Sequence, residues 1–530
     1  MKKILSVCFF TSIIFLSGCD QIVSEPWKTI ELERVSIHDP SVVSVVDDNQ
    51  KETYYLFGSH LAEAKSSTLL TWEVPFNSEY EEMSNNLILG DVDKNLKESF
   101  EWAGKDDADS SGGYSIWAPD VIYLPQYQWK NGDKGAYLYY YSVTSTWRRS
   151  AIGYAVSKSV EGPYEYVDTI VYSGFTEVDS TDGSDRNTNY VGTNVGDLIK
   201  EGIIEAFNPD WVRKNGTEYN TDYAPNAIDP ALFFDEEGKL WMTYGSWSGG
   251  IYLLEMDAKT GAAIYPGGSS KMKDKQIVDP YFGTKLSGGY HHSGEGPFIV
   301  YDETTKFYYL FETYGGLASD GGYNMRLFRS EKPDGPYVDL NGNQPIHKNG
   351  ADKEDNYGLK VMGNYQFDDM LKAYKAQGHN SALINQSGEW LLFFHTRFSQ
   401  SGENHEVRIH PMLMNEENWP VTMPYEYTEP VSDSPISEES VLGSYELINH
   451  GTKTEKTVVK SETIELVADG KILGDQQGSW QLKEGNFIEL EINEVSYQGV
   501  IAQQKNENNK ECLIFSAVGN NQTVWGSKKN

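Results

Sequence analysis

A polar side chain begins each of five short β-rich runs in this sequence, and four of the five are carboxylic acids. They are Asp39, Asp120, Asp229, Glu295 and His379. A glycine or proline lies within two residues of each, which disfavours a helix, and the runs that follow are rich in strand-forming residues. Hydrolysis of a glycosidic bond needs one protonated and one ionised carboxyl group close together. The pattern therefore indicates a carboxylate site, with a solvated loop acid as the ordinary alternative for any single residue.

Each of these residues opens the same succession of elements: a short strand, a polar turn and an aromatic strand. In the third copy, Asp229 precedes the run 231–234, the turn 235–238 and the aromatic run 240–244. Repeats of this kind, each large enough for a four-stranded antiparallel sheet, favour an all-β, five-bladed β-propeller. No stretch of the chain has a long helical period.

The propeller explains how residues so far apart in sequence could meet. The first strand of each blade lines the central channel, so the five leading residues would surround one end of it. The loops between second and third strands return to the same face and bring Trp247 and Arg397 with them. Carboxylates and aromatic rings grouped in this way outline a sugar site, because carboxylates bond hydroxyls and rings stack on sugar faces. Trp117 is placed to stack on a sugar or to pack in the core, and Asp120 is expected to cap loop amides.

Charge and composition exclude some partners. The 530 residues carry a formal net charge of −34, and 13% of them are aromatic. Such an acidic surface is repelled by nucleic acid and by anionic membranes, so we expect neither as a partner. The aromatic content suits strand faces and sugar faces alike.

The first 18 residues have the build of a signal peptide: two lysines, an apolar run from Ile4 to Leu16, and small residues. The sequence Leu16-Ser17-Gly18-Cys19 resembles the bacterial lipoprotein signal, which implies a lipid on Cys19. An ordinary secretory signal is the alternative, and either places the protein outside the cytoplasm. Beyond Cys19 the only cysteine is Cys512, so no intrachain disulfide is expected to hold the mature fold.

The chain divides by composition into five parts. We expect a signal peptide (1–18), a linker (19–34), the propeller (35–431), a second linker (432–441) and a small C-terminal β-barrel or sandwich (442–530). Residues 174–228 are a polar insertion before the third blade, expected to form a rim loop over the active face. Its Asp179, Asp182 and Asp185 do not match the spacing of a known cation-binding loop.

Five motifs in order carry a family resemblance. They are His38-Asp39-Pro40, Ile116-Trp117-Ala118-Pro119-Asp120, Asn226-Ala227-Ile228-Asp229-Pro230, Glu295-Gly296-Pro297 and Gly378-His379-Asn380-Ser381. Together they resemble glycoside hydrolase family 43, and within it the larger endo-1,5-α-L-arabinanases that carry a C-terminal β-barrel. The resemblance covers about residues 35–530. The long insertion and the sequence His291-His292-Ser293 before Glu295 depart from many relatives, which leaves substrate preference less secure than reaction type.

The resemblance implies roles for individual residues. Asp39 would be the general base, Glu295 the general acid, and Asp229 the carboxylate that tunes and orients the acid. His379 would face a Ca²⁺ ion in the central channel. Substrate contacts would come from two segments of the active face, Asn226, Ala227 and Ile228 together with Ser246, Trp247 and Ser248.

The expected activity is inverting cleavage of internal α-1,5-L-arabinofuranosidic bonds of arabinan, a side chain of pectin, by a protein that we expect to be a monomer. Two alternatives stay open. One is an exo-acting α-L-arabinofuranosidase or β-xylosidase, and the other is a surface glycan-binding propeller without turnover. The three acids favour an enzyme, because a binding protein gains nothing from crowding carboxylates at a channel.

Overall fold

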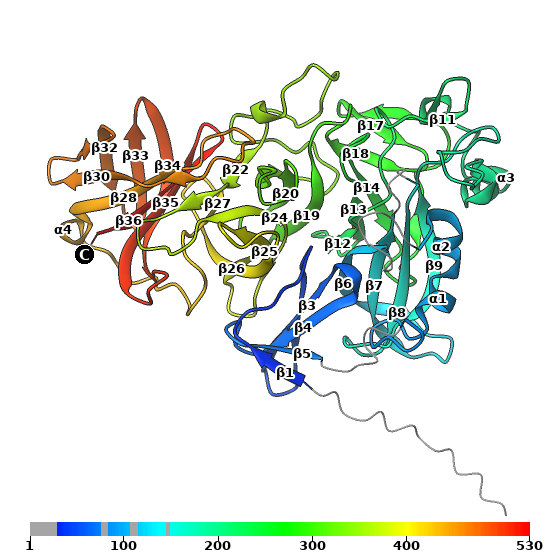
Figure 1. The fold of residues 1–530 in the computed structure, drawn as a ribbon, viewed down its shortest axis with the longest axis horizontal. Coiled ribbons are helices and arrows are strands. Elements are labelled where there is room, and N and C mark those ends of the chain that lie inside the picture. The colour runs from blue at the N-terminus through cyan, green and yellow to red at the C-terminus, as the bar shows by residue number, and fades with distance from the viewer. Residues whose placement is uncertain (1–28, 76–82, 106–114, 145–148, 530) are drawn as a thin grey trace, which may run out of the picture.

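The computed structural model describes residues 29–75, 83–105, 115–144 and 149–529, so the signal peptide and Cys19 lie outside the described residues. Five antiparallel sheets surround a central channel, and a closed barrel stands beside them (Figure 1). The innermost strands of the sheets contact one another in a closed ring. In order these strands are β2 (Ser41–Val46), β6 (Ile116–Gln128), β12 (Ala231–Phe234), β19 (Glu295–Asp302) and β24 (Tyr374–Ile384). The predicted five-bladed propeller is confirmed.

The first two blades are regular meanders in which each strand pairs with the next along the chain. Blade 1 continues from β2 through β3 (Glu52–Gly58), β4 (Ala62–Ser66) and β5 (Trp72–Pro75), and β1 (Thr29–Leu32) pairs with β5 at its outer edge. Blade 2 continues from β6 through β7 (Lys134–Val143), β8 (Ala151–Ser157) and β9 (Glu165–Tyr172). Residues 29–32 were predicted as linker; instead they form a strand, because the outer edge of blade 1 offers unpaired backbone groups.

Blades 3 to 5 carry additions at their edges. Blade 3 contains β12, β13 (Leu240–Tyr244), β14 (Ile251–Met256) and β18 (Gly283–Ser287), extended by β15 (Ala263–Ile264), β16 (Lys271–Lys273) and β17 (Gln276–Asp279). Blade 4 contains β19, β20 (Phe307–Tyr314), β21 (Asn324–Ser330) and β22 (Leu359–Met362). Blade 5 contains β24, β25 (Trp390–Phe398), β26 (His405–Met414) and β27 (Pro420–Thr422), with β23 (Tyr365–Gln366) on the inner side of β24.

Short helices occupy the connections between blades. The connection from blade 1 to blade 2 holds α1 (Val92–Asn95) and α2 (Lys97–Ala103), which follow η1 (Ser59–Leu61) of blade 1. The insertion before blade 3 holds η3 (Tyr190–Gly192), α3 (Val195–Lys200), η4 (Pro209–Trp211) and the hairpin of β10 (Val212–Arg213) with β11 (Glu218–Tyr219). The connection from blade 4 to blade 5 holds η5 (Glu354–Asn356). No helix among the described residues is long and apolar enough to cross a membrane.

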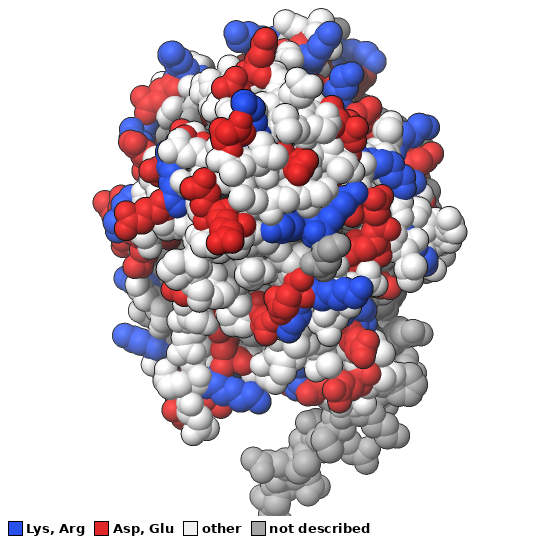
Figure 2. Space-filling view, turned by 90° about the vertical axis from the view of Figure 1, so that its left-hand side faces the viewer, with Lys and Arg blue, Asp and Glu red and all other residues white. Residues whose placement is uncertain are grey.

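Eight strands close the C-terminal barrel, which agrees with the predicted small β-domain. They are β28 (Gly443–Asn449), β30 (Glu462–Val467), β31 (Lys471–Gly474), β32 (Gly478–Leu482), β33 (Phe487–Ile492), β34 (Val495–Lys505), β35 (Glu511–Gly519) and β36 (Gln522–Lys528). The short α4 (Glu438–Val441) lies within the stretch predicted as linker. On the face of the molecule that the barrel end presents, acidic and basic side chains are interspersed (Figure 2).

The barrel and the propeller share a hydrophobic core. One buried cluster joins Phe394 and Trp419 of blade 5 to Ile514 and Trp525 of the barrel. The segment between β28 and β30 contributes β29 (Val459–Lys460), which pairs in parallel with β23 and so extends the sheet of blade 5. The barrel is therefore packed against the propeller through a shared apolar cluster.

Candidate active site

One backbone conformation recurs at the start of all five innermost strands. Asp39, Ala118, Asp229, Gly296 and His379 each have a positive φ, between 40° and 58°. A proline follows the first four, and Asn380 follows His379. The left-handed region is unfavourable for most residues other than glycine, so its repetition shows that these five positions are equivalent in the five blades.

The equivalence corrects the predicted ring of leading residues. Asp39, Asp229 and His379 occupy the left-handed position itself. Glu295 lies one residue before that position in its blade, and Asp120 lies two residues after it. The four acids and His379 are therefore not equivalent positions of the five blades, because Glu295 and Asp120 are offset along their strands from Asp39, Asp229 and His379. The prediction matched the five repeats by their polar residues. In the structure the equivalent positions are the residues with positive φ at the start of each strand.

Asp120 is a structural link between blades. Its two carboxylate oxygens accept hydrogen bonds from Ser41 Oγ of blade 1 (2.5 Å) and from the backbone nitrogen of Leu232 in blade 3 (2.6 Å). The residue is 4% exposed, and burial raises its pKa to about 6. Asp120 was expected to cap loop amides; the amide that it bonds, that of Leu232, lies instead within β12 of the neighbouring blade.

Asp39 is surrounded by histidines. Its Oδ1 lies 2.7 Å from Nδ1 of His38 and 3.0 Å from Nδ1 of His379, and its Oδ2 accepts a hydrogen bond from Ser59 Oγ (2.5 Å). Burial alone would raise the pKa of Asp39, but His379 and His38 hold that pKa well below its usual value. Asp39 is therefore ionised at neutral pH, as a general base must be.

Glu295 is fixed by three donors from two neighbouring loops. Its Oε2 accepts from Trp247 Nε1 (2.8 Å) and Ser246 Oγ (3.1 Å), and its Oε1 accepts from Tyr323 OH (2.6 Å). Two of these partners belong to the loop 246–248 that was predicted to touch substrate. Their contact in the structure is with the acid, so their first effect is to set its orientation.

Asp229 interacts electrostatically with both of the other acids, Asp39 and Glu295. Its Oδ2 accepts from the backbone nitrogen of Gly296 (3.1 Å), which ties it to the strand that Glu295 begins. Burial raises the pKa of Asp229 to about 7; His379 opposes this rise, and Glu295 and Asp39 add to it. A carboxyl group that titrates near neutrality beside the proposed acid can carry or withhold a negative charge there.

His379 joins the acids from blade 5. Its ring packs against Gly296, where an added Cβ would lie 2.9 Å from ring carbons, so no other residue fits beside it. Burial lowers the pKa of His379, but Asp39 and Asp229 outweigh burial and raise it to about 9. The histidine thus links the left-handed positions of three blades.

A small cavity in the channel is lined by Asp39, Asp229 and His379. Its volume is about 20 Å³, enough for one water-sized particle, and its walls come from the innermost strands of all five blades. Asn380 lines it, is 2% exposed, and has no hydrogen-bond partner for either side-chain atom among the described residues. Carboxylate, amide and water oxygens are the ligands that Ca²⁺ prefers, so Asn380 and the carboxylates of this wall could serve an ion beside His379, although the cavity has room for the ion alone and not for a shell of water around it.

A second group of potential ligands lies behind Asp39. One atom from each of His38, Asp39 and His395 falls within 4.8 Å of the others. The rings of His38 and His395 are stacked with centroids 4.1 Å apart. Two imidazoles and a carboxylate suit a transition metal better than calcium. Their contacts with Asp39 already account for their positions.

The remaining predicted substrate residues vary in access. Asn226 and Ala227 are buried, and Asn226 Oδ1 accepts from Ser150 Oγ (2.7 Å) and Ser173 Oγ (3.3 Å). Ile228 is half-buried, directly before Asp229. Ser248 is fully buried, and its Oγ has no hydrogen-bond partner among the described residues. Asn226, Ala227 and Ser248 are thus enclosed by the protein, and substrate contact by these residues stays a prediction.

Trp117 lies on β6 of blade 2, and Arg397 lies on β25 of blade 5. Trp117 is half-buried, and its ring makes an edge contact with His60, centroids 4.4 Å apart. Arg397 is 4% exposed and forms an ion pair with Glu403 (2.7 Å). Glu403 in turn accepts from the backbone nitrogen of Ser319 (3.0 Å), which fastens a loop of blade 5 to a loop of blade 4.

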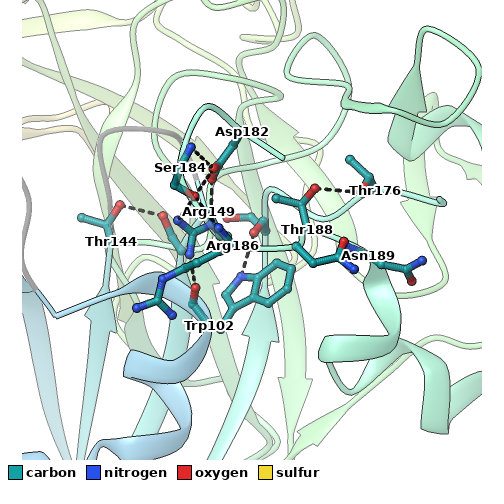
Figure 3. A network of polar contacts seen from close by, with 12 residues as sticks. Trp102, Thr144, Arg149, Thr176, Asp182, Ser184, Arg186, Thr188 and Asn189 are labelled. Carbon is teal, nitrogen blue, oxygen red and sulfur yellow. Dashed lines mark hydrogen bonds and ion pairs between the residues drawn. The ribbon is translucent and has the colours of Figure 1, made fainter. Parts of the chain in front are cut away.

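The insertion is anchored to blade 2 by a buried arginine (Figure 3). Arg149 is 2% exposed, and its guanidinium bonds Asp182 Oδ2 (2.7 Å), Ser184 Oγ (3.3 Å) and the backbone oxygen of Trp102 in α2. Asp182 is thus engaged by protein groups, and Asp179 accepts from Asn187 and Asn189. Because the insertion connects the end of β9 to the start of β12, it lies on the active face, as a rim loop would.

Two residues of the site were not foreseen. Ser59 bonds both Asp39 and the backbone nitrogen of Ala118, and Tyr323 bonds Glu295. Ser59 stands next to His60 in a loop expected on the active face, so its position was available from the sequence. Tyr323 follows two glycines at the start of a third strand, and nothing in the sequence marks it.

Comparison with known proteins gives consistent matches over the whole chain. The family model described as "Glycosyl hydrolases family 43" matches residues 204–420, and a model of a C-terminal lipocalin-like domain of that family matches residues 424–526. Extracellular endo-alpha-(1->5)-L-arabinanase 2 of Bacillus subtilis (strain 168) is 35% identical over 541 residues, covering 99% of this chain and 100% of that protein. The extracellular endo-alpha-(1->5)-L-arabinanase of Thermotoga petrophila is 37% identical over 505 residues, covering 92% and 93%. The crystal structure of endo-1,5-alpha-L-arabinanase from Thermotoga petrophila RKU-1 superposes with a TM-score of 0.75 at 35% identity, covering 94% of this chain and 99% of that chain.

Proposed function

The chain belongs to family 43 of the glycosyl hydrolases and is a glycosidase, and from this premise we propose that it cleaves internal α-1,5-L-arabinofuranosidic bonds of arabinan. The two similar proteins that are named endo-acting arabinanases match this chain over nearly its whole length, which favours arabinan over xylan as the substrate.

One observation carries the proposal beyond resemblance. Three carboxyl groups from three blades meet at one end of the channel, and each has a different environment. Asp39 is held ionised by His379 and His38, Asp229 titrates at about 7, and Glu295 is oriented by Trp247, Ser246 and Tyr323. A glycan-binding protein has no use for this division, whereas acid and base catalysis depends on it.

The geometry suggests how the residues act. Glu295 gives its proton to the oxygen of the leaving sugar as the glycosidic bond breaks. Asp39 takes a proton from a water molecule, which attacks the anomeric carbon from the opposite face. Asp229, bonded to the backbone nitrogen of Gly296, holds the start of the strand that carries the acid in place. Proton transfer by a positioned group contributes about 10²–10⁴-fold to such a reaction.

We also propose that a calcium ion occupies the channel cavity, with His379 in its neutral form as the protein ligand. The volume of about 20 Å³ and the unpartnered amide of Asn380 support this assignment. A divalent cation there would supply positive charge close to Asp39 and help to keep it ionised.

The proposed location is outside the cell. The similar proteins are named extracellular, and the N-terminal signal leads to Cys19, so we propose a lipid-anchored monomer on the outer face of the bacterial membrane. Mass spectrometry of the mature N-terminus from cells would distinguish a lipid on Cys19 from simple secretion.

The deciding experiment is incubation of the purified protein with linear arabinan, branched arabinan and xylan, followed by sizing of the products. A ladder of arabino-oligosaccharides from linear arabinan is expected at early times. Arabinose alone would show exo action, xylose products would show a different substrate, and retention of polymer without products would show a binding protein.

A further inference from the structure

An aromatic side chain with no partner stands on the loop that leads to the proposed acid. Tyr290 is 40% exposed, and no hydrogen bond, ion pair or ring contact involves its side chain in the described structure. The loop 288–294 runs from the end of β18, at the outer part of blade 3, to Glu295 at the channel. Tyr290 therefore lies on the active face, in the segment that connects the outer strand β18 to Glu295 at the channel.

The backbone at this point is strained. Tyr290 and His291 both have a positive φ, 56° and 64°, and neither is a residue that favours that region as glycine does. Consecutive residues of this kind persist only where the surroundings hold them, and they gather at functional sites. In this conformation the Tyr290 side chain is exposed to solvent.

Contacts on two sides hold the loop in this shape. The backbone nitrogen of Tyr290 donates to the backbone oxygen of Asp222 in the insertion (3.2 Å), and that of His291 donates to the backbone oxygen of Ser248 (3.0 Å). The ring of His291 bonds Thr221 Oγ1 (2.5 Å). On the far side, the ring of His292 stacks on that of His347, centroids 3.9 Å apart.

The insertion is itself braced where it touches this loop. Arg213 forms ion pairs with Glu218 (2.7 Å) and Asp222 (3.3 Å). A rigid aromatic ring that is already ordered costs little entropy when a ligand stacks on it. The insertion thus holds the backbone of Tyr290 and the ring of the next residue, His291.

We propose that Tyr290 is a stacking platform for a sugar unit on the leaving-group side of the cleaved bond. Glu295 protonates the leaving sugar, so a chain that extends past Glu295 on that side follows the loop on which Tyr290 stands. The assignment rests on the proposed cleavage of arabinan. It makes Tyr290 and the insertion determinants of the preference for long chains over short ones.

The test compares two substrates and three variants. Tyr290→Asn removes the ring while keeping a residue that tolerates a positive φ, and Tyr290→Phe keeps the ring. Tyr123→Ala is the control, because Tyr123 is a similarly exposed tyrosine (45%) on β6 of another blade. The substrates are linear arabinan and arabinotriose, and kcat and KM are measured for each.

Tyr290→Asn should lower kcat/KM on linear arabinan by about three- to tenfold, mainly through KM, and leave arabinotriose unchanged. Tyr290→Phe and Tyr123→Ala should both stay within about twofold of wild type. An unchanged value on arabinan, an equal loss on both substrates, or a matching loss in either of the other variants would overturn the inference. Wild-type protein that leaves linear arabinan intact would instead overturn the proposed function, and the inference with it.

Discussion

Asp39 Oδ1 and His379 Nδ1 lie 3.0 Å apart, and the two residues occupy the same left-handed position in the first and the last blade. The contact therefore spans the point where the propeller ring closes. The residue proposed as base and the residue proposed as metal ligand depend on the same closure. A change in the packing of blade 1 against blade 5 would therefore alter the contact between Asp39 and His379.

The metal proposal is tested by His379→Ala. We expect loss of retained calcium together with loss of activity, while the propeller stays folded, because the side chain faces the channel and not a blade core. Elemental analysis of the purified protein measures the metal, and circular dichroism checks the fold. His410→Ala removes another buried histidine, one bonded to the backbone of Met423, and should keep its calcium. Wild-type protein without bound calcium would contradict the proposal.

The acid is tested by Glu295→Gln. The amide keeps the shape of the side chain and loses the proton, so cleavage of linear arabinan should fall by about 10²–10⁴-fold while binding is retained. Initial rates and an affinity measurement on the same polymer give both values. A variant that keeps more than about a tenth of the wild-type rate would show that Glu295 is not the acid.

The stereochemistry of the reaction tests Asp39. Asp39 and Glu295 belong to blades 1 and 4, which are not neighbours in the ring. A base that activates water requires carboxyl groups about 6.5–9.5 Å apart, whereas direct attack requires about 5–5.5 Å. Placement across the channel favours the wider gap and inversion. Proton NMR should show the β-anomer first; an initial α-anomer, or a sugar trapped on Asp39, would refute the assignment.

A buried acid outside the channel gives a pH prediction. Glu312 on β20 is fully buried, and burial raises its pKa to about 7 against an opposing contact with the Ser287 side chain. A carboxyl whose pKa is higher in the folded state contributes stability that is complete below the unfolded pKa, near 4.5, and is lost as the pH rises to about 7. The loss amounts to about 3 kcal/mol.

Glu312→Gln removes this titration. Its melting temperature should be close to that of wild type at pH 4.5 and several degrees higher at pH 8, measured at one scan rate. Glu303→Gln changes an exposed acid in the turn after β19 and should follow wild type at both values of pH. A Glu312→Gln profile parallel to that of wild type would mean that Glu312 stays paired or hydrated in solution.

The sequence was sufficient for the architecture because the five repeats share a local signal. A polar residue beside proline or glycine, followed by a β-rich run, marks the entry to each innermost strand, and strand pairing follows from there. The positions of the polar residues along the channel could not be predicted from the sequence. Asp120 and Glu295 are displaced by two residues and one residue from Asp39 and Asp229, and only the repeated positive φ reveals the displacement.

The contacts that tune the site depend on neighbours that are distant in sequence. Tyr323 reaches Glu295 from the third strand of the same blade, and His38 and His379 reach Asp39 from blades 1 and 5. Residue type and spacing do not encode such contacts, since many tyrosines and histidines stand at comparable places in the repeats. Packing of one blade on the next decides which of them meet.

The pairing of β29 with β23 has a consequence for how the protein can be handled. Two residues of the C-terminal half complete the sheet of blade 5, so a chain cut at 432–441 leaves the backbone of Tyr365 and Gln366 open at an edge. An open edge invites pairing with the edge of another molecule. The isolated propeller is therefore expected to aggregate, and the propeller and the barrel should be expressed and stored as one chain.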